Sequence, residues 1–322
     1  MARYLKLTAA AALAAAILSG CTSCGSGGNA STDPNLPPVT RPAFDSARAW
    51  ADLLAQEKMG PRTPGSAAHD QLQALLISEM EASADRTLQQ KFTASCAFGG
   101  PYHFVNVIGC FSEAKSGRSL LLGCHWDSRP VSDHDPDPAR RHDPCPGIND
   151  GASTVAVLLE VARALKKQPP DIPVYIVFLD AEDIGTDGSS LPYQGFCVGT
   201  VEFARQMDTL HLRPSQAIII DMIGDQDLRI NLEQNSRASN RQLQDVVFDT
   251  AAKLGHPAFV KEPGPTMIDD HIPLIQAGVP SIDLIDFDYP QWHTTQDTSA
   301  HCGEQSLMQV GDTLLEVIYS KP

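Results

Sequence analysis

The chain has 322 residues, of which 42% are hydrophobic, and it carries a formal net charge of −15 at pH 7. This length suffices for one large α/β domain with a sizeable core or for two smaller domains. The acidic balance argues against nucleic acid as a partner, because no basic surface is available to offset phosphate charge. After the N-terminus no run approaches the roughly 18 apolar residues of a transmembrane helix, so none is predicted in the body of the chain.

Residues 1–20 have the features of a secretory signal peptide: a short basic start, an Ala/Leu/Ile run, and then L-S-G-C at 18–21. This last box resembles that of bacterial lipoprotein signals, in which cleavage precedes a lipidated cysteine. We therefore expect an exported lipoprotein that touches the membrane only through a lipid on Cys21. Thr22 resembles the sorting pattern for the outer membrane. An ordinary signal peptide with an incidental cysteine is the alternative.

Residues 21–41 are rich in Gly, Ser, Asn, Asp and Pro, a composition typical of a flexible tether. The catalytic domain is accordingly expected over residues 42–322. Export permits disulfides among the eight cysteines. If Cys21 is lipidated, seven remain, so at least one is unpaired or pairs between chains. Cys124, at the end of an apolar strand, is expected to be a buried thiol.

Within this domain, strands and helices alternate along the chain. Hydrophobic periodicity predicts helices over 43–59, 66–84, 152–167, 201–207, 239–254 and 304–319, and a short one ending at Gly278. Strands are predicted over 87–93, 103–111, 119–123, 174–179, 216–220, 228–232 and 280–287. The alternation indicates a largely parallel sheet covered by helices on both faces.

Three acids follow the buried strand 174–179 within four residues: Asp180, Glu182 and Asp183. Carboxylates that leave an apolar core together repel one another unless a metal ion or a shared proton relieves them. This cluster is therefore the predicted centre of a metal site.

Other candidate residues also stand where a strand has just ended. His125 and Asp127 lie two apart, so an extended backbone aims both side chains the same way. Asp150 opens a buried helix, and a helix cap is the alternative role for it. Since sites form at the carboxyl ends of parallel strands, all of these positions can converge. The converging set is Asp127, Asp150, Glu182, Asp183, Asp221, Asp269 and His293.

The side-chain types favour zinc in a catalytic role. A set of Asp, Asp and His without Cys suits a zinc ion that keeps a position open for substrate or water. Magnesium would prefer oxygen ligands alone. Because Glu182 adjoins Asp183, one carboxylate can bind the ion while its neighbour moves protons.

Several motifs together resemble the co-catalytic zinc aminopeptidase superfamily and, within it, the animal-type glutaminyl cyclases and their bacterial relatives. The matching segments are G-P-R-T-P-G-S at 60–66, H-W-D-S-R-P at 125–130, N-D-G-A-S at 149–153, D-A-E-D at 180–183, D-D-H-I-P at 269–273 and W-H-T at 292–294. They occur in family order across the whole domain. D-D-H-I-P and the tryptophan directly before His293 are typical of the cyclase branch.

The resemblance implies a single domain with a central twisted mixed sheet. It also implies one zinc ion, held by Asp150, Asp183 and His293. Glu182 would be the general acid and base. Asp221 and Asp269 would form a hydrogen-bonded acid pair near the substrate amine.

The implied reaction converts the N-terminal glutamine of a peptide or protein to pyroglutamate with release of ammonia. Zinc would polarise the side-chain amide, the peptide's own α-amine would attack it, and Glu182 would shuttle the proton. Trp292 would wall the pocket. Phe196 or Tyr193 would replace a tryptophan that cyclases carry in the preceding loop, and Asp283 stands where animal cyclases have a histidine.

Two other functions remain open on the sequence. In a two-zinc aminopeptidase, Asp150 would bridge two ions, His125 and Asp221 would help to bind the second, and Glu182 would activate water. Asp127 would bind the second ion or support its ligands. A non-catalytic ectodomain that binds peptide or protein is the third possibility, and loss of the metal ligands would be its signature.

Overall fold

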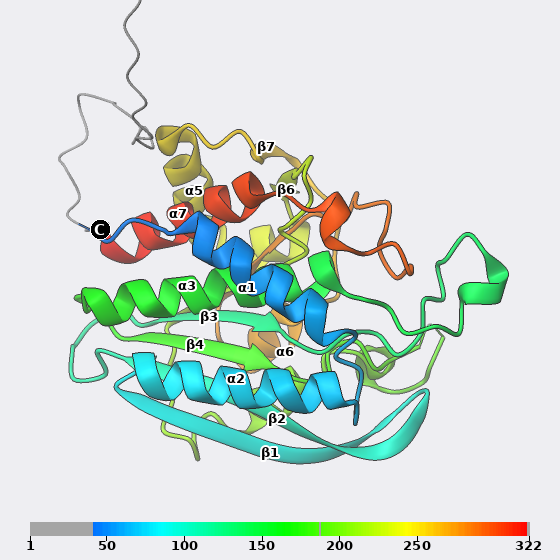
Figure 1. Ribbon diagram of the computed structural model, residues 1–322. Helices are drawn as coiled ribbons and strands as arrows, with labels where there is room; N and C mark the ends of the chain where they lie inside the picture. The colour runs from blue at the N-terminus through cyan, green and yellow to red at the C-terminus, as the bar shows by residue number, and fades with distance from the viewer. Residues whose placement is uncertain (1–40, 187, 321–322) are drawn as a thin grey trace, which may run out of the picture. The chain divides into compact units, whose positions relative to one another are not determined.

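The computed structural model describes residues 41–186 and 188–320, so the predicted signal peptide and almost all of the predicted tether lie outside the described residues. A six-stranded sheet runs through the domain in the order β1-β2-β4-β3-β5-β8 (Figure 1). The strands are β1 (Arg86–Cys96), β2 (Gly99–Phe111), β3 (Leu120–His125), β4 (Val174–Leu179), β5 (Gln216–Asp221) and β8 (Ser281–Ile285). The four adjacent strands β4, β3, β5 and β8 run parallel to one another. Strand β2 is antiparallel to both of its neighbours, β1 and β4. The predicted mixed sheet is confirmed.

Helices cover both faces of this sheet (Figure 1). The larger core lies under α1 (Ser46–Met59), α2 (Ala67–Ser83), α3 (Ser153–Lys167), α5 (Gln234–Leu254) and α7 (Glu304–Tyr319). The smaller core lies under α4 (Val198–Gln206) and α6 (His271–Gln276). Side chains alternate between the two: Ile176 and Phe178 of β4 enter the larger core, and Tyr175 and Val177 enter the smaller one.

Two features of the fold differ from the sequence-based prediction. A second, two-stranded parallel sheet pairs β6 (Ile230–Leu232) with β7 (Phe259–Pro263), and β7 was not predicted. Asp150 does not cap α3. It has φ −81° and ψ 97°, and Gly151 follows with φ 91°, so the chain turns sharply before the helix begins at Ser153. This turn frees the Asp150 carboxylate to face other elements.

All six cysteines of the described residues are buried and unpaired: Cys96, Cys110, Cys124, Cys145, Cys197 and Cys302. The expectation of a buried thiol at Cys124 is confirmed. Burial raises the pKa of Cys124 to about 12, so this thiol stays protonated and unreactive at neutral pH. Within the described residues, no helix is long and apolar enough to cross a bilayer.

Close packing of α4 against the end of β4 generates a stability prediction. A Cβ added at Gly199 would collide with the carbonyl oxygen of Asp180 and would lie 2.8 Å from Asn106 Oδ1. Ala is favoured over Gly by about 1 kcal/mol in an unhindered helix. Here we expect Gly199→Ala to lower the free energy of unfolding instead, by about 1–3 kcal/mol, the usual cost of overpacking. Chemical denaturation measures the change, and a stabilised variant would contradict this close approach.

Candidate active site

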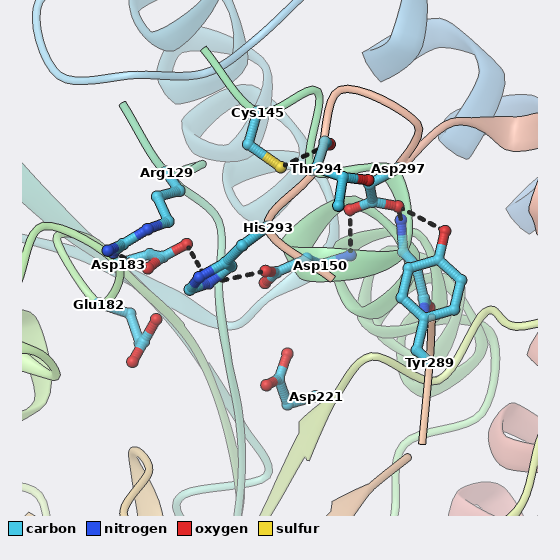
Figure 2. A network of polar contacts seen from close by, with 12 residues as sticks. Arg129, Cys145, Asp150, Glu182, Asp183, Asp221, Tyr289, His293, Thr294 and Asp297 are labelled. Atoms are coloured by element: carbon cyan, nitrogen blue, oxygen red, sulfur yellow. Dashed lines mark hydrogen bonds and ion pairs between the residues drawn. The ribbon is translucent and has the colours of Figure 1, made fainter. Parts of the chain in front are cut away.

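Three buried side chains from separate elements meet beyond the carboxyl end of the sheet. Asp150 comes from the turn before α3, Asp183 from the loop after β4, and His293 from the loop after β8 (Figure 2). His293 Nε2 lies 3.3 Å from Asp183 Oδ2 and 3.6 Å from Asp150 Oδ2. The three residues each offer a ligand atom, and these atoms all lie within 4.8 Å of one another.

This group fits a tetrahedral metal ion. Zinc binds carboxylate oxygen and imidazole nitrogen at about 2.0–2.2 Å, which places ligand atoms roughly 3.4 Å apart. The observed separations of 3.3 and 3.6 Å agree with that value. Asp183 Oδ2 is buried and has no hydrogen-bond partner, which is costly for a carboxylate unless a cation binds it.

A buried arginine holds two of these side chains in place. Arg129, which lies beside Asp183 in Figure 2, donates to Asp183 Oδ1 at 2.9 Å. Through two nitrogens it also donates to the Asp133 carboxylate at 2.8 and 2.6 Å. Asp133 Oδ1 in turn lies 3.6 Å from His293 Nδ1. Burial alone would lower the pKa of His293, but Asp183 and Asp133 raise it to about 9. The sequence-based prediction gave no role to Arg129 or Asp133, although Arg129 belongs to the H-W-D-S-R-P motif.

Asp297 anchors the turn that carries Asp150. Its carboxylate accepts the backbone N–H of Asn149 at 2.8 Å and of Asp150 at 3.2 Å, and the hydroxyl of Tyr289 at 2.9 Å (Figure 2). Burial, reinforced by the nearby Asp150 carboxylate, raises the pKa of Asp297 to about 6. On the other side of the turn, the fully buried guanidinium of Arg62 donates to the Gly147 carbonyl at 2.5 Å. This contact gives the G-P-R motif a role in holding the turn that carries Asp150.

Asp127 supports the site through the backbone. Its two oxygens accept the N–H groups of Glu182 at 3.0 Å and Asp183 at 3.1 Å. The Glu182 carboxylate then faces the cavity, where its Oε1 accepts the Cys197 thiol at 3.6 Å. Burial, followed by the charge of Asp183, raises the pKa of Glu182 well above its usual range. A carboxyl with a raised pKa is suited to accepting and returning a proton.

A second group of possible ligands lies beside the first. His125 Nε2 is 3.0 Å from Asp150 Oδ1 and 3.2 Å from Asp221 Oδ1. Burial raises the pKa of Asp221 to about 7, although the contact with His125 opposes this shift. Within the described residues, the Asp221 side chain hydrogen-bonds to His125, and the expected pairing of Asp221 with Asp269 stays a prediction.

The ligand group and Glu182 open into a cavity of about 200 Å³. The indole of Trp292 stacks on His293 with ring centroids 3.8 Å apart and meets Phe287 edge-on at 4.9 Å. Phe196 also lines the cavity, and its ring centroid lies 5.3 Å from the Arg129 guanidinium. The remaining lining is mostly apolar or acidic: Asp150, Asp183, Tyr193, Gln194, Asp221, Met222, Met267, Ile268, Asp269 and Ile285.

The sequence and the fold are both similar to those of known proteins. The model of peptidase family M28 matches residues 106–318. A glutaminyl-peptide cyclotransferase-like protein from Mus musculus is 28% identical over 287 residues, which cover 80% of this chain and 71% of that protein.

Among solved structures, a Zn-dependent exopeptidase from Parabacteroides distasonis superposes with a TM-score of 0.84 at 33% identity. A Bacteroides thetaiotaomicron glutaminyl cyclase, solved with N-acetylhistamine, superposes with a TM-score of 0.82 at 32% identity. Each of the two matches covers 88% of this chain and 100% of the other.

The hydrogen bonds of Asp297 predict its importance for metal affinity. We expect Asp297→Asn to weaken zinc binding by about 10- to 100-fold, the usual effect of removing a group that orients a ligand. The reason is that the two backbone N–H groups donate to different oxygens of Asp297, so in the amide one of them would face an NH₂. Titration against a chromophoric chelator gives the Kd. Asp286→Asn is the matched control, because Asp286 is also buried and also accepts two backbone N–H groups, but does not line the cavity. Equal affinity in both variants would contradict this role.

Proposed function

Since the chain belongs to peptidase family M28, we propose that it is a zinc-dependent glutaminyl-peptide cyclotransferase, which converts the N-terminal glutamine of peptides or proteins to pyroglutamate with release of ammonia. The observation that carries the proposal is a carboxylate, Glu182, facing the Asp150–Asp183–His293 group inside a small aromatic-walled cavity. Similarity to the mouse cyclotransferase-like protein over 80% of this chain supports the same reaction.

One zinc ion would be held by Asp150, Asp183 and His293. When bound, it supplies Lewis-acid polarisation of the glutamine side-chain amide. Two distances support a single ion. His125 Nε2 lies 3.0 Å from Asp150 Oδ1 and 3.2 Å from Asp221 Oδ1, which are hydrogen-bond distances. These groups can therefore satisfy one another without a second metal.

Glu182 performs the proton transfers. It accepts a proton from the α-amine of the substrate as that amine attacks the side-chain carbonyl, and it returns the proton to the departing ammonia. The nucleophile belongs to the substrate itself, so catalysis gains from proximity once the peptide is held. Asp127 keeps Glu182 in place through its backbone N–H.

The other cavity residues bind and enclose the substrate. Asp269 and Asp221 are the carboxylates that can receive the substrate amine, and both line the cavity. Trp292 and Phe196 enclose the glutamine side chain and exclude water, which the reaction does not consume.

Hydrolysis of N-terminal residues by a two-zinc aminopeptidase is the competing function. The group of His125, Asp150 and Asp221 has metal-ligand spacing and favours it. A leucine aminopeptidase precursor from Bacteroides thetaiotaomicron also superposes on this chain with a TM-score of 0.83. In that case Glu182 would activate a water molecule rather than an amine.

The substrates are peptide or protein N-termini, and nucleic acid is not a partner. We also propose that the mature protein is an exported bacterial lipoprotein, attached to the outer membrane through a lipid on Cys21. The L-S-G-C box supports this location.

A substrate comparison tests the proposed reaction. A Gln-initiated peptide should release ammonia and keep all its residues, whereas Leu- and Ala-initiated amides should stay intact. Metal analysis should find one zinc per chain, and chelation should abolish turnover until zinc is restored. Free amino acid with two zinc ions per chain would establish the aminopeptidase. Intact substrates and no metal would leave a peptide-binding protein.

Glu182→Gln tests the proton carrier. The amide keeps the shape of the side chain but cannot accept the amine proton, so kcat should fall by about 10²- to 10⁴-fold while zinc content stays the same. Glu160→Gln is the control, since Glu160 is a buried glutamate in α3 that pairs with Arg48, away from the cavity. Wild-type turnover in Glu182→Gln would disprove the assigned role.

A further inference from the structure

The fully buried Cys197 holds Glu182, the proposed proton carrier, by two contacts. Its thiol donates to Glu182 Oε1 at 3.6 Å, and its backbone N–H donates to the Glu182 carbonyl oxygen at 2.9 Å. Beside this pair, the N–H of Val198 donates to the carbonyl oxygen of Ala181 at 3.1 Å. The start of α4 is thereby fastened to the segment that carries Glu182.

Both segments adopt an uncommon backbone conformation at this junction. Cys197 has φ 55° and ψ 28°, and Ala181 has φ 60°. Residues other than glycine avoid this left-handed region, because Cβ crowds the neighbouring backbone. A glycine at position 197 could make the same backbone hydrogen bond without that cost. The strained conformation of Cys197 therefore directs attention to its thiol.

The surroundings of Cys197 make the thiol a hydrogen-bond donor. Its side chain is fully buried and does not line the cavity, so it does not meet the substrate. Burial, followed by the charge of Glu182, raises the pKa of Cys197 well above its usual range. The thiol therefore keeps its proton at neutral pH and does not act as a nucleophile.

The thiol controls a degree of freedom of Glu182 that the backbone contacts leave open. Asp127 accepts the Glu182 N–H at 3.0 Å, and the Cys197 N–H binds the Glu182 carbonyl oxygen, so both contacts fix the main chain. Neither restricts rotation of the carboxylate about its terminal bond, which is soft. A donor bound to Oε1 does restrict it.

We propose that the Cys197 thiol is a positioning residue for catalysis, which fixes the rotation of the Glu182 carboxylate and leaves Oε2 free to take the proton from the substrate amine and return it to the leaving group. The thiol touches no reacting atom and keeps its own proton throughout. Its role in turnover rests on the proposed cyclotransferase function, whereas its contact with Glu182 does not.

Two substitutions separate this role from packing. Cys197→Ser keeps a donor, and Cys197→Ala removes it. We expect kcat to fall about tenfold in Cys197→Ala, a part of the roughly 10²- to 10⁴-fold that a general base contributes, with KM and zinc content unchanged. Cys197→Ser should recover most of this loss. A packing role predicts the opposite order, because buried cysteine packs as a small apolar side chain and an unpaired hydroxyl is costly there. Equal losses, or wild-type kcat in Cys197→Ala, would overturn the proposal.

Cys110→Ala is the matched control. Cys110 is also fully buried and unpaired, but it pairs in the sheet with Tyr175 at the start of β4, whereas Glu182 follows the end of that strand. This variant loses the same sulfur atom away from the cavity and should keep wild-type kcat. A comparable loss of kcat in Cys110→Ala would show that removing a buried thiol is harmful in itself, and would refute the assigned role.

Infrared spectroscopy of the S–H stretch tests the contact in the zinc-loaded protein without using activity. A hydrogen-bonded thiol absorbs at a lower frequency than a free one. The difference between the spectra of the wild type and Cys197→Ala assigns the Cys197 band. This band should move to higher frequency in Glu182→Gln, because an amide accepts a hydrogen bond more weakly than a carboxylate, and it should stay in place in Glu160→Gln.

Two spectroscopic results would exclude the thiol contact. One is a Cys197 band that does not respond to Glu182→Gln. The other is the absence of any Cys197 band, which would mean a thiolate, as expected if Glu182, Cys197 and Asp269, whose ligand-type atoms lie within 4.8 Å of one another, held a metal ion instead. If the protein proved to be a peptidase, this readout would still decide whether Cys197 orients Glu182.

Discussion

Electrostatic repulsion among buried carboxylates is the constraint on which this structure depends. Asp127, Asp150, Asp180, Asp183, Asp221, Asp269, Asp270 and Asp297 are all buried or nearly so around the carboxyl ends of the strands. Such a concentration of acids is unfavourable in a protein interior unless cations, hydrogen-bond donors or shared protons offset it. The residues around these acids supply cations or hydrogen-bond donors.

Different groups offset the charge of different carboxylates. Arg129 pairs with Asp183, His125 lies between Asp150 and Asp221, and His69 Nε2 lies 2.9 Å from Asp180 Oδ1. Asp127 and Asp297 instead receive backbone N–H groups, so these two acids act as anchors for the loops that carry Glu182 and Asp150. A bound metal ion would relieve the repulsion between Asp150 and Asp183.

The same architecture serves related reactions in the family. A metal group beside a general base suits both attack by water and attack by a substrate amine. The cavity also encloses this site with aromatic rings: Trp292 stacks directly on His293, and Phe196 packs near Arg129. An enclosed aromatic cavity favours the reaction that consumes no water.

The alternation of strands and helices, the sheet with helices on both faces and the candidate positions at strand ends could all be predicted from the sequence. They depend on local periodicity and on the geometric rule that parallel strands end at one edge. Which side chains pair across that edge was decided only by the tertiary structure. Asp221 bonds to His125, and Arg129 joins Asp183 to Asp133. Asp283 and His271 lie 12 residues apart in the chain and meet only because α6 packs against β8. Pairing of this kind depends on placing distant segments to within a few tenths of an ångström. Residue spacing along a chain carries no such information.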